Sequence, residues 1–179
     1  MKLITISVLG LLVSLWGCSS PSPIRTASQV DLNRFMGDWY VIANIPTFIE
    51  TEAFNAVESY RLNDNGTIAT TFTFREGSFE GEEKWYHPTG FIVDQESNAI
   101  WGMQFLWPFK ADYRIVFVND DYTQTIIGRL ERDYVWIMAR TPSIAEDDYR
   151  RLLNIISGQG YDISQIRKVP QQWKEVPRG

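Results

Sequence analysis

The sequence predicts an all-β fold, an eight-stranded antiparallel up-and-down β-barrel with a C-terminal α-helix packed on its wall. Eight segments after residue 38 are rich in β-branched and aromatic residues, and short turn signals separate several of them. One amphipathic segment follows the eighth. Short connections favour antiparallel pairing of neighbouring strands, and closing eight strands into a barrel removes exposed sheet edges.

The chain begins with a segment that is typical of a bacterial secretory leader. Met1 and Lys2 provide a positive start, and residues 3–16 form an apolar run that is too short for a comfortable transmembrane helix. The run ends in Leu15-Trp16-Gly17-Cys18, which resembles the lipobox of bacterial lipoproteins, although Trp16 stands where a small residue is usual. We therefore expect residues 1–17 to be a signal peptide and Cys18 to be acylated. The alternative is a buried cysteine after an ordinary secretory signal.

Residues 18–30 are predicted to be a lipidated flexible tether, because Ser19-Ser20-Pro21-Ser22-Pro23 follows the cysteine directly. Several acyl chains on one N-terminus give durable membrane binding, whereas one chain does not. In Gram-negative lipoproteins, a serine after the cysteine accompanies sorting to the outer membrane. That resemblance implies a lipid anchor in the outer membrane, most simply on its periplasmic face.

The barrel is expected within residues 31–170, followed by a tail at 171–179. Residues 31–36 are typical of a helical turn that Asp31 caps and Gly37 ends. Turn signals such as Asn63-Asp64-Asn65-Gly66 and Asn119-Asp120-Asp121 separate the predicted strands. These strands are Trp39–Ile45, Asn55–Leu62, Thr67–Phe74, Lys84–Val93, Ala99–Leu106, Tyr113–Val118, Thr123–Leu130 and Tyr134–Arg140.

The predicted helix begins after the eighth strand. Ser143 and Glu146 have the spacing of a capping box, and acidic residues fill the first turn. Gly158 and Gly160 are expected to end the helix. Its apolar stripe, which should pack on the outer wall of the barrel, is Ala145, Tyr149, Leu152, Leu153 and Ile156.

Composition excludes several classes of function. The formal net charge is −5 and no cluster of Lys or Arg is present, which argues against nucleic-acid binding. The chain has one cysteine and one histidine, His87, so no intrachain disulfide is possible and no metal site or cofactor is expected. The unusual feature is an aromatic content of 14%, which favours a cavity lined by flat side chains.

Three short motifs, in order and spacing, resemble those of the lipocalin family. They are Gly37-Asp38-Trp39-Tyr40, Asn119-Asp120-Asp121-Tyr122 and Arg140 at the end of the eighth strand. The segment from Arg132 to Pro142 is most similar to the bacterial outer-membrane lipoprotein lipocalins, relatives of apolipoprotein D. The resemblance implies that the motif Trp and the late Arg pack together at the closed end of the barrel. We assign structural roles to Gly37, Trp39, Asp121, Tyr122 and Arg140; the alternative for Asp121 is a catalytic acid beside Arg140.

Alternation along each strand, matched to the inward parity of the lipocalins, predicts the side chains that face the lumen. Glu58 is the unusual member, because a buried carboxylate is costly; it lies at the wet rim, which we favour, or meets a polar ligand group. The predicted lumen contains Val41, Ala43, Ala56, Glu58, Tyr60, Ile68, Thr70, Phe72, Tyr86, Trp101, Met103, Phe105, Tyr113, Ile115, Phe117, Tyr134, Trp136 and Met138.

Two loops are candidates for the mouth of the barrel. By the resemblance, residues 45–54 form the large lid loop, in which Phe48, Ile49 and Phe54 would touch ligand or bilayer. The apolar loop 106–109 either shares the mouth or packs on a neighbouring strand.

The resemblance implies a noncatalytic protein that binds fatty acids or lysophospholipids, and the sequence leaves open whether two barrels pair as a homodimer. One alternative is a lipid-modifying enzyme, but the only thiol is Cys18 and no Gly-x-Ser-x-Gly motif is present, so a hydrolase would have to use His87. Another is a pigment or haem carrier. Because Tyr86 is placed inside, His87 on the same regular strand should face out.

Overall fold

The computed structural model describes residues 23–173. The leader, Cys18, the first part of the tether and residues 174–179 of the tail therefore lie outside the described residues. None of the helices within residues 23–173 is long and apolar enough to cross a bilayer.

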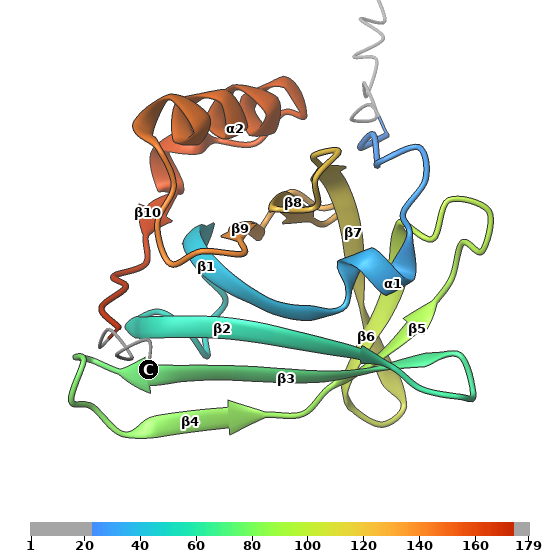
Figure 1. Ribbon diagram of the computed structural model, residues 1–179, viewed down its shortest axis with the longest axis horizontal. Coiled ribbons are helices and arrows are strands. Elements are labelled where there is room, and N and C mark those ends of the chain that lie inside the picture. The colour runs from blue at the N-terminus through green and yellow to red at the C-terminus, as the bar shows by residue number, and fades with distance from the viewer. Residues whose placement is uncertain (1–22, 174–179) are drawn as a thin grey trace, which may run out of the picture.

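The described chain folds into a closed antiparallel barrel (Figure 1). Each barrel strand pairs with its neighbours, and β1 pairs with β9 to close the sheet, with Tyr40 opposite Ala139 and Ile45 opposite Val135. This confirms the predicted fold class. The strands are β1 (Gly37–Ile45), β2 (Ala53–Leu62), β3 (Thr67–Glu76), β4 (Glu83–Tyr86), β5 (Thr89–Ile92), β6 (Ile100–Leu106), β7 (Phe109–Val118), β8 (Gln124–Gly128) and β9 (Val135–Ala139).

The predicted strand Lys84–Val93 is divided into β4 and β5, which both pair with β3. The interruption falls at His87 and Pro88. Proline has no N–H to give to a sheet, and here the Pro88 carbonyl accepts a hydrogen bond from the Thr70 N–H. Together β4 and β5 complete the eight-stranded wall as one bent strand.

A short helix, α1 (Leu32–Phe35), lies at one end of the barrel. Asp31 caps it by accepting hydrogen bonds from the N–H groups of Asn33 and Arg34. The buried Phe35 ring lies 5.1 Å from the Trp39 ring, and its carbonyl accepts a hydrogen bond from the Trp39 indole. This helix therefore presents the apolar surface that fills the closed end.

Arg140 joins α1 to the barrel. Its guanidinium lies 3.8 Å from the centroid of the Trp39 ring, which is the arrangement that the family resemblance implies. All its hydrogen bonds within the described residues go to backbone carbonyls, those of Arg34, Phe35, Met36, Asp38 and Tyr122. Gly37 has a φ of +94°, and a Cβ there would lie 3.3 Å from Arg140 Nη1.

The motif residues Asp121 and Tyr122 lie in the turn that faces α1. The Tyr122 hydroxyl accepts a hydrogen bond from the Asp31 N–H at 2.8 Å, and the Arg34 guanidinium lies 4.2 Å from the centroid of its ring. Asp121 is exposed. Since Arg140 bonds only carbonyls, the arrangement favours the structural role of this turn over the catalytic alternative.

Helix α2 (Glu146–Gly158) packs outside the barrel, with Tyr149, Leu152 and Ile156 buried. The predicted capping box is wrong. The N-cap is Ala145, which has no capping side chain, and the Glu146 carboxylate pairs with Lys168, 3.1 Å away. Without a capping side chain, the positive N-terminal end of the helix dipole is stabilised by the negative charges of Glu146, Asp147 and Asp148 in the first turn.

After α2 the chain returns to the barrel through the 3-10 helix η1 (Ile163–Gln165) and the two-residue strand β10 (Arg167–Lys168), which pairs with β1. Residues 171–173 continue along the barrel edge, where the Gln171 amide bonds the Val41 and Ala56 carbonyls. The tail predicted to begin at 171 is therefore packed over its first three residues.

Two hydrophobic clusters stabilise the fold, one inside the barrel and one between the barrel wall and α2. Ile24 is buried in the outer cluster and Val30 in the inner one, so the predicted flexible tether is wrong for residues 24–30. Every buried residue of both clusters lies between 24 and 169. Both clusters are formed by residues that the structure describes, and a chain starting at residue 23 is expected to fold.

Replacing Arg140 by alanine should lower the free energy of unfolding by about 3 kcal/mol, because buried carbonyls lose charged hydrogen-bond donors and Trp39 loses its cation. Urea unfolding of residues 23–179 measures this. Arg150→Ala, on the exposed face of α2, is the control and should change stability by less than about 0.5 kcal/mol. Equal unfolding curves for the two variants would contradict a closing role for Arg140.

Candidate ligand-binding pocket

Within the described part of the chain, four strands carry register shifts, and two of these shifts correct the predicted lumen. One lies in β1 between Val41 and Ala43, and the other in β7 between Ile115 and Phe117. Each bulge inserts one extra residue and so reverses the alternation beyond it. The lumen assignments of Ala43 and Phe117 are therefore wrong: both belong to the outer cluster, where Phe117 lies under the Arg151 guanidinium.

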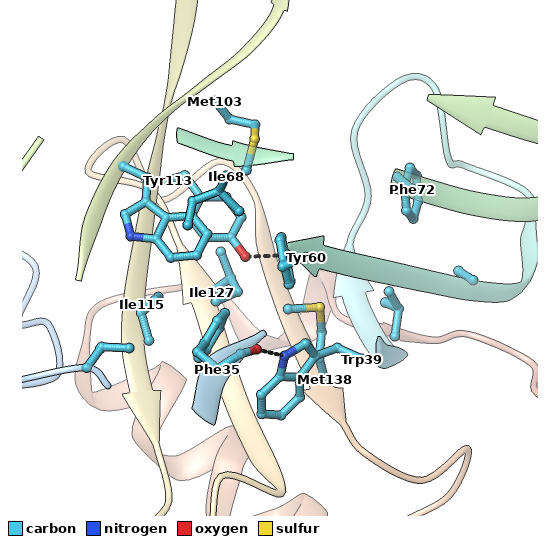
Figure 2. Packing of buried hydrophobic residues seen from close by; sticks show 14 of the residues in the cluster. Phe35, Trp39, Tyr60, Ile68, Phe72, Met103, Tyr113, Ile115, Ile127 and Met138 are labelled. Carbon is cyan, nitrogen blue, oxygen red and sulfur yellow. Dashed lines mark hydrogen bonds between the residues drawn. The ribbon is translucent and has the colours of Figure 1, made fainter. Parts of the chain in front are cut away.

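The deep part of the lumen is solid core (Figure 2). Phe35 and Tyr60 each pack edge to face against Trp101. Trp101 also stacks on Tyr113, with ring centroids 5.2 Å apart. These rings fill the closed end and leave no room for a ligand among them. Seven predicted lumen residues belong to this packed floor and do not line the pocket: Val41, Ala56, Tyr60, Ile68, Trp101, Ile115 and Met138.

A cavity of about 530 Å³ lies above this floor, within the range typical of small-molecule sites. The open-end loop of residues 46–52 contributes to it, and Phe48, which is 86% exposed, marks the mouth. Nine predicted lumen residues line the cavity: Glu58, Thr70, Phe72, Tyr86, Met103, Phe105, Tyr113, Tyr134 and Trp136.

Of the two predicted mouth loops, only the first contributes to the pocket. Phe48 and Ile49 line it, whereas Phe54 packs against Phe79 with ring centroids 5.0 Å apart. Trp107 and Phe109 are 80% and 74% exposed and do not line the cavity.

Glu58 is a carboxylic acid in the wall of the pocket. The Tyr60 hydroxyl donates a short hydrogen bond to its Oε2 and lies 2.6 Å from the Tyr113 hydroxyl. Burial, and then the negative charge of Glu50, raises the pKa of Glu58 to about 8. The favoured interpretation that Glu58 lies at the wet rim is therefore wrong: its carboxyl belongs to the pocket wall, next to the packed floor.

Glu50 is a second buried acid that the sequence interpretation missed. Its side chain is 4% exposed, and its Oε1 accepts hydrogen bonds from Thr47 N–H, Thr47 Oγ1 and Trp136 Nε1, each at 3.0 Å. Burial raises the pKa of Glu50, and these donors oppose the rise. The available signal was Thr47-x-x-Glu50, the spacing at which a glutamate returns to the start of a turn.

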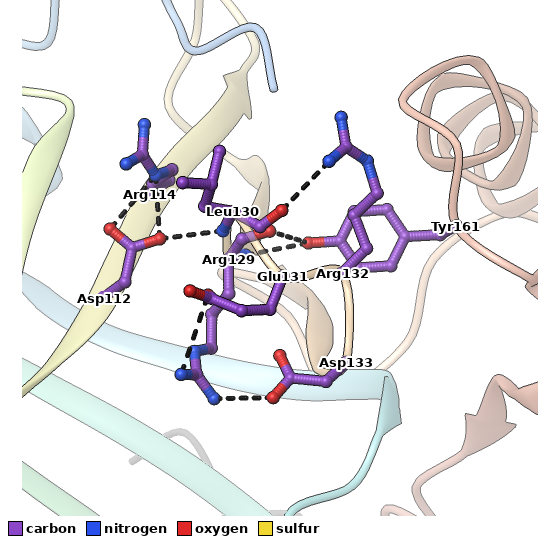
Figure 3. A network of polar contacts seen from close by, with 8 residues as sticks. All are labelled: Asp112, Arg114, Arg129, Leu130, Glu131, Arg132, Asp133 and Tyr161. Carbon is purple, nitrogen blue, oxygen red and sulfur yellow. Dashed lines mark hydrogen bonds and ion pairs between the residues drawn. The ribbon is translucent and has the colours of Figure 1, made fainter. Parts of the chain in front are cut away.

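Charged residues at the exposed side of the pocket are already paired (Figure 3). Arg129 Nη1 lies 2.9 Å from Asp133 Oδ2, and Arg129 Nη2 lies 3.8 Å from Glu131. The carboxylate of Asp112 accepts hydrogen bonds from the Arg114 guanidinium and from the Leu130 N–H. Arg129 is thus the only cationic residue among those that line the pocket, and anions compensate it.

His87 lies at the interruption between β4 and β5. Its Nδ1 is 3.3 Å from Thr71 Oγ1 and its ring stacks near Trp85, while Tyr86 stacks on Phe74. The imidazole is exposed, although the residue borders the pocket. Within residues 23–173, no group of three His, Cys, Asp or Glu side chains is arranged to hold a metal ion.

The stability of the protein should fall as the pH rises from about 4.5 to about 8, because Glu58 is protonated in the folded state across that window and ionised in the unfolded state. Glu58→Gln removes the part of this dependence that Glu58 contributes. Between pH 4.5 and 8, the free energy of unfolding of the variant should therefore rise relative to that of the wild type by at most about 5 kcal/mol. Thermal unfolding across this pH range measures the difference. The exposed Glu80→Gln variant is the control; parallel curves for wild type and Glu58→Gln would rule out a raised pKa.

Comparison with known proteins identifies the same family at the level of the domain profile and of individual relatives. A profile of lipocalin-like domains matches residues 30–171. The outer membrane lipoprotein Blc of Citrobacter freundii is 27% identical over 159 residues, covering 86% of this chain and 88% of that protein. Temperature-induced lipocalin-1 of Arabidopsis thaliana is 30% identical over 157 residues, covering 83% of each chain.

More distant proteins share the architecture. Apolipoprotein D of Macaca fascicularis is 25% identical, in an alignment that covers 87% of this chain and 82% of that protein. The solved structure of insecticyanin from the tobacco hornworm superposes with a TM-score of 0.66 at 14% identity, over 85% of each chain. At that identity the similarity shows the fold alone.

Proposed function

Because this chain belongs to the family of lipocalin-like domains, to which residues 30–171 match, we propose that it binds a long-chain amphiphile, a fatty acid or a lysophospholipid, without chemical turnover. Proteins of this family bind small hydrophobic ligands, and the barrel has the cavity that such binding needs. The proposed role is storage or transport of the ligand close to a membrane.

The observation that carries this proposal is the lining of the cavity. Its walls are mainly aromatic and aliphatic, with Phe72, Met103 and Trp136 facing one space from three strands. Burial of an acyl chain there contributes roughly 25 cal/mol for each Å² of apolar area removed from water. Few polar groups, chiefly Glu58, Thr70 and Tyr113, are available to orient a head group.

A noncatalytic role is favoured by how the candidate catalytic groups are used. Glu50 is held by Thr47 and Trp136, and Asp112 by Arg114, so neither is free to activate water. The imidazole of His87 is exposed and contacts Thr71. Among residues 23–173 it has no hydrogen-bonded carboxylate partner of the kind that a hydrolase triad requires.

The membrane anchor is part of the proposal. Relatives over most of the chain are named as outer membrane lipoproteins, and the Leu15–Cys18 segment has the form of a lipidation site. We place the protein at the outer membrane, held on the periplasmic face through acylated Cys18 and the residues that follow it. The barrel would then remain within reach of the lipids that supply its ligand.

Residues 23–179 should bind lysophospholipid or fatty acid with one ligand per barrel, seen by native mass spectrometry and by a change in tryptophan fluorescence. Met103→Trp fills part of the cavity and should weaken binding at least tenfold, about 1.4 kcal/mol. Phe117→Ala, which truncates a side chain on the outer wall, is the matched control and should leave affinity within about twofold. Undiminished binding by Met103→Trp would place the ligand outside the barrel.

The mature protein should begin at Cys18 and carry acyl chains. Intact-mass measurement of the full chain expressed in a Gram-negative host tests this, together with incorporation of labelled palmitate. Cys18→Ser should remove the label, because no other thiol is present, whereas Ser19→Ala should retain it. Label on Cys18→Ser, or a mature N-terminus elsewhere, would count against the anchor.

A further inference from the structure

One polar cluster interrupts the apolar wall of the pocket. It consists of Glu58, Tyr60 and Tyr113. The Tyr60 hydroxyl contacts the Glu58 carboxyl. It also lies 2.6 Å from the Tyr113 hydroxyl (Figure 2). Only Glu58 Oε2 is engaged: within residues 23–173, no other side chain or N–H donates to this carboxyl. The cluster therefore offers a carboxyl oxygen to whatever occupies the pocket.

The charges around this cluster favour a cation. Glu50 faces the same cavity, and its negative charge is felt at Glu58, whose pKa it helps to raise. Asp112 also lines the pocket, but its carboxylate is paired with Arg114. Arg129, the only cationic residue among those that line the pocket, is paired with Asp133 and Glu131. An anionic head group beside Glu58 would lie near the like charges of Glu58 and Glu50, whereas Arg129 has both Nη atoms paired and, among its guanidinium atoms, only the buried Nε without a hydrogen-bond partner in the described residues.

We infer that the pocket selects amphiphiles whose head group carries an ammonium, which Glu58 binds. A free carboxylate at the same position is disfavoured. This inference rests on the proposed function and narrows its ligand class. A buried ammonium is tolerated where it is paired with a carboxylate and hydrogen-bonded. Glu58 supplies the pairing charge once its proton has left to solvent, and Tyr113, the other member of the cluster that lines the pocket, supplies a hydroxyl oxygen beside it. The acyl chain then lies along Phe72, Met103 and Trp136 towards the mouth.

The head-group preference can be separated from chain binding by using three ligands with the same tail. Dodecylammonium, dodecanol and dodecanoate differ only in the head group and share the apolar surface that the cavity buries. Each is titrated below its micellar concentration into residues 23–179 at about pH 9, above the pKa of about 8 of Glu58, where an alkyl amine is still protonated and a free carboxylic acid is ionised. We expect dodecylammonium to bind at least tenfold more tightly than dodecanoate.

Two variants test Glu58 directly. Glu58→Gln should weaken dodecylammonium at least tenfold and leave dodecanol within about threefold, because only the charge is removed. Glu58→Met gives the same comparison with an apolar side chain of similar volume, in case the glutamine variant folds poorly. Glu80→Gln, which removes an exposed carboxylate, is the matched control and should leave all three affinities unchanged.

The outcomes distinguish this inference from the proposed function. Failure of all three ligands to bind the wild-type barrel would overturn both. Binding of dodecanol with dodecanoate equal to or tighter than dodecylammonium would overturn the head-group inference and leave chain binding standing. Dodecanol as the tightest ligand, or a Glu58→Gln variant that keeps the ammonium preference, would likewise show that Glu58 does not select the head group.

Discussion

Arg140 closes one end of the barrel, and the pocket depends on that closure. Its guanidinium covers Trp39 and binds the carbonyls of α1, so the helix is held as a plug. Beneath that plug Phe35 packs against Trp101 and Tyr60. The closed end is therefore rigid apolar core, and the empty volume of the barrel is left on the side of the 46–52 loop.

The same packing explains why one carboxyl in the lumen is tolerated. Tyr60 belongs to the packed floor, and its hydroxyl contacts two residues that line the pocket, Glu58 and Tyr113. Part of the cost of burying Glu58 is met by this hydrogen bond, and part by holding a proton, as its raised pKa indicates. The packed rings of the closed end and the titratable carboxyl of Glu58 are thus joined in one structural unit through Tyr60.

Much of the barrel could be predicted from sequence because its signals are periodic and local. Alternation identified the strands, and the pairing of Trp39 with Arg140 followed from motifs that the family shares. The bulges at Val41 and Ile115 carry no such signal, since they arise where strands must bend around a closed sheet. Each bulge reverses the alternation of inward and outward side chains beyond it. Ala43 and Phe117, which follow the bulges, were therefore assigned to the lumen wrongly, whereas Trp39 and Tyr113, which precede them, were assigned to the inside correctly.

The polar part of the pocket was less predictable for a different reason. Alternation along the strand placed the Glu58 carboxyl in the lumen, which marked it as unusual. Its depth in the lumen, however, depends on how much of the closed end is filled by packed rings such as Trp101 on Tyr113. Glu50 lies in a loop, where alternation says nothing, and only its return to Thr47 and Trp136 brings it inward. Two acids from separate elements thus share one cavity. Their mutual repulsion, which neither segment reveals alone, turns an ordinary apolar pocket into one that can discriminate by charge.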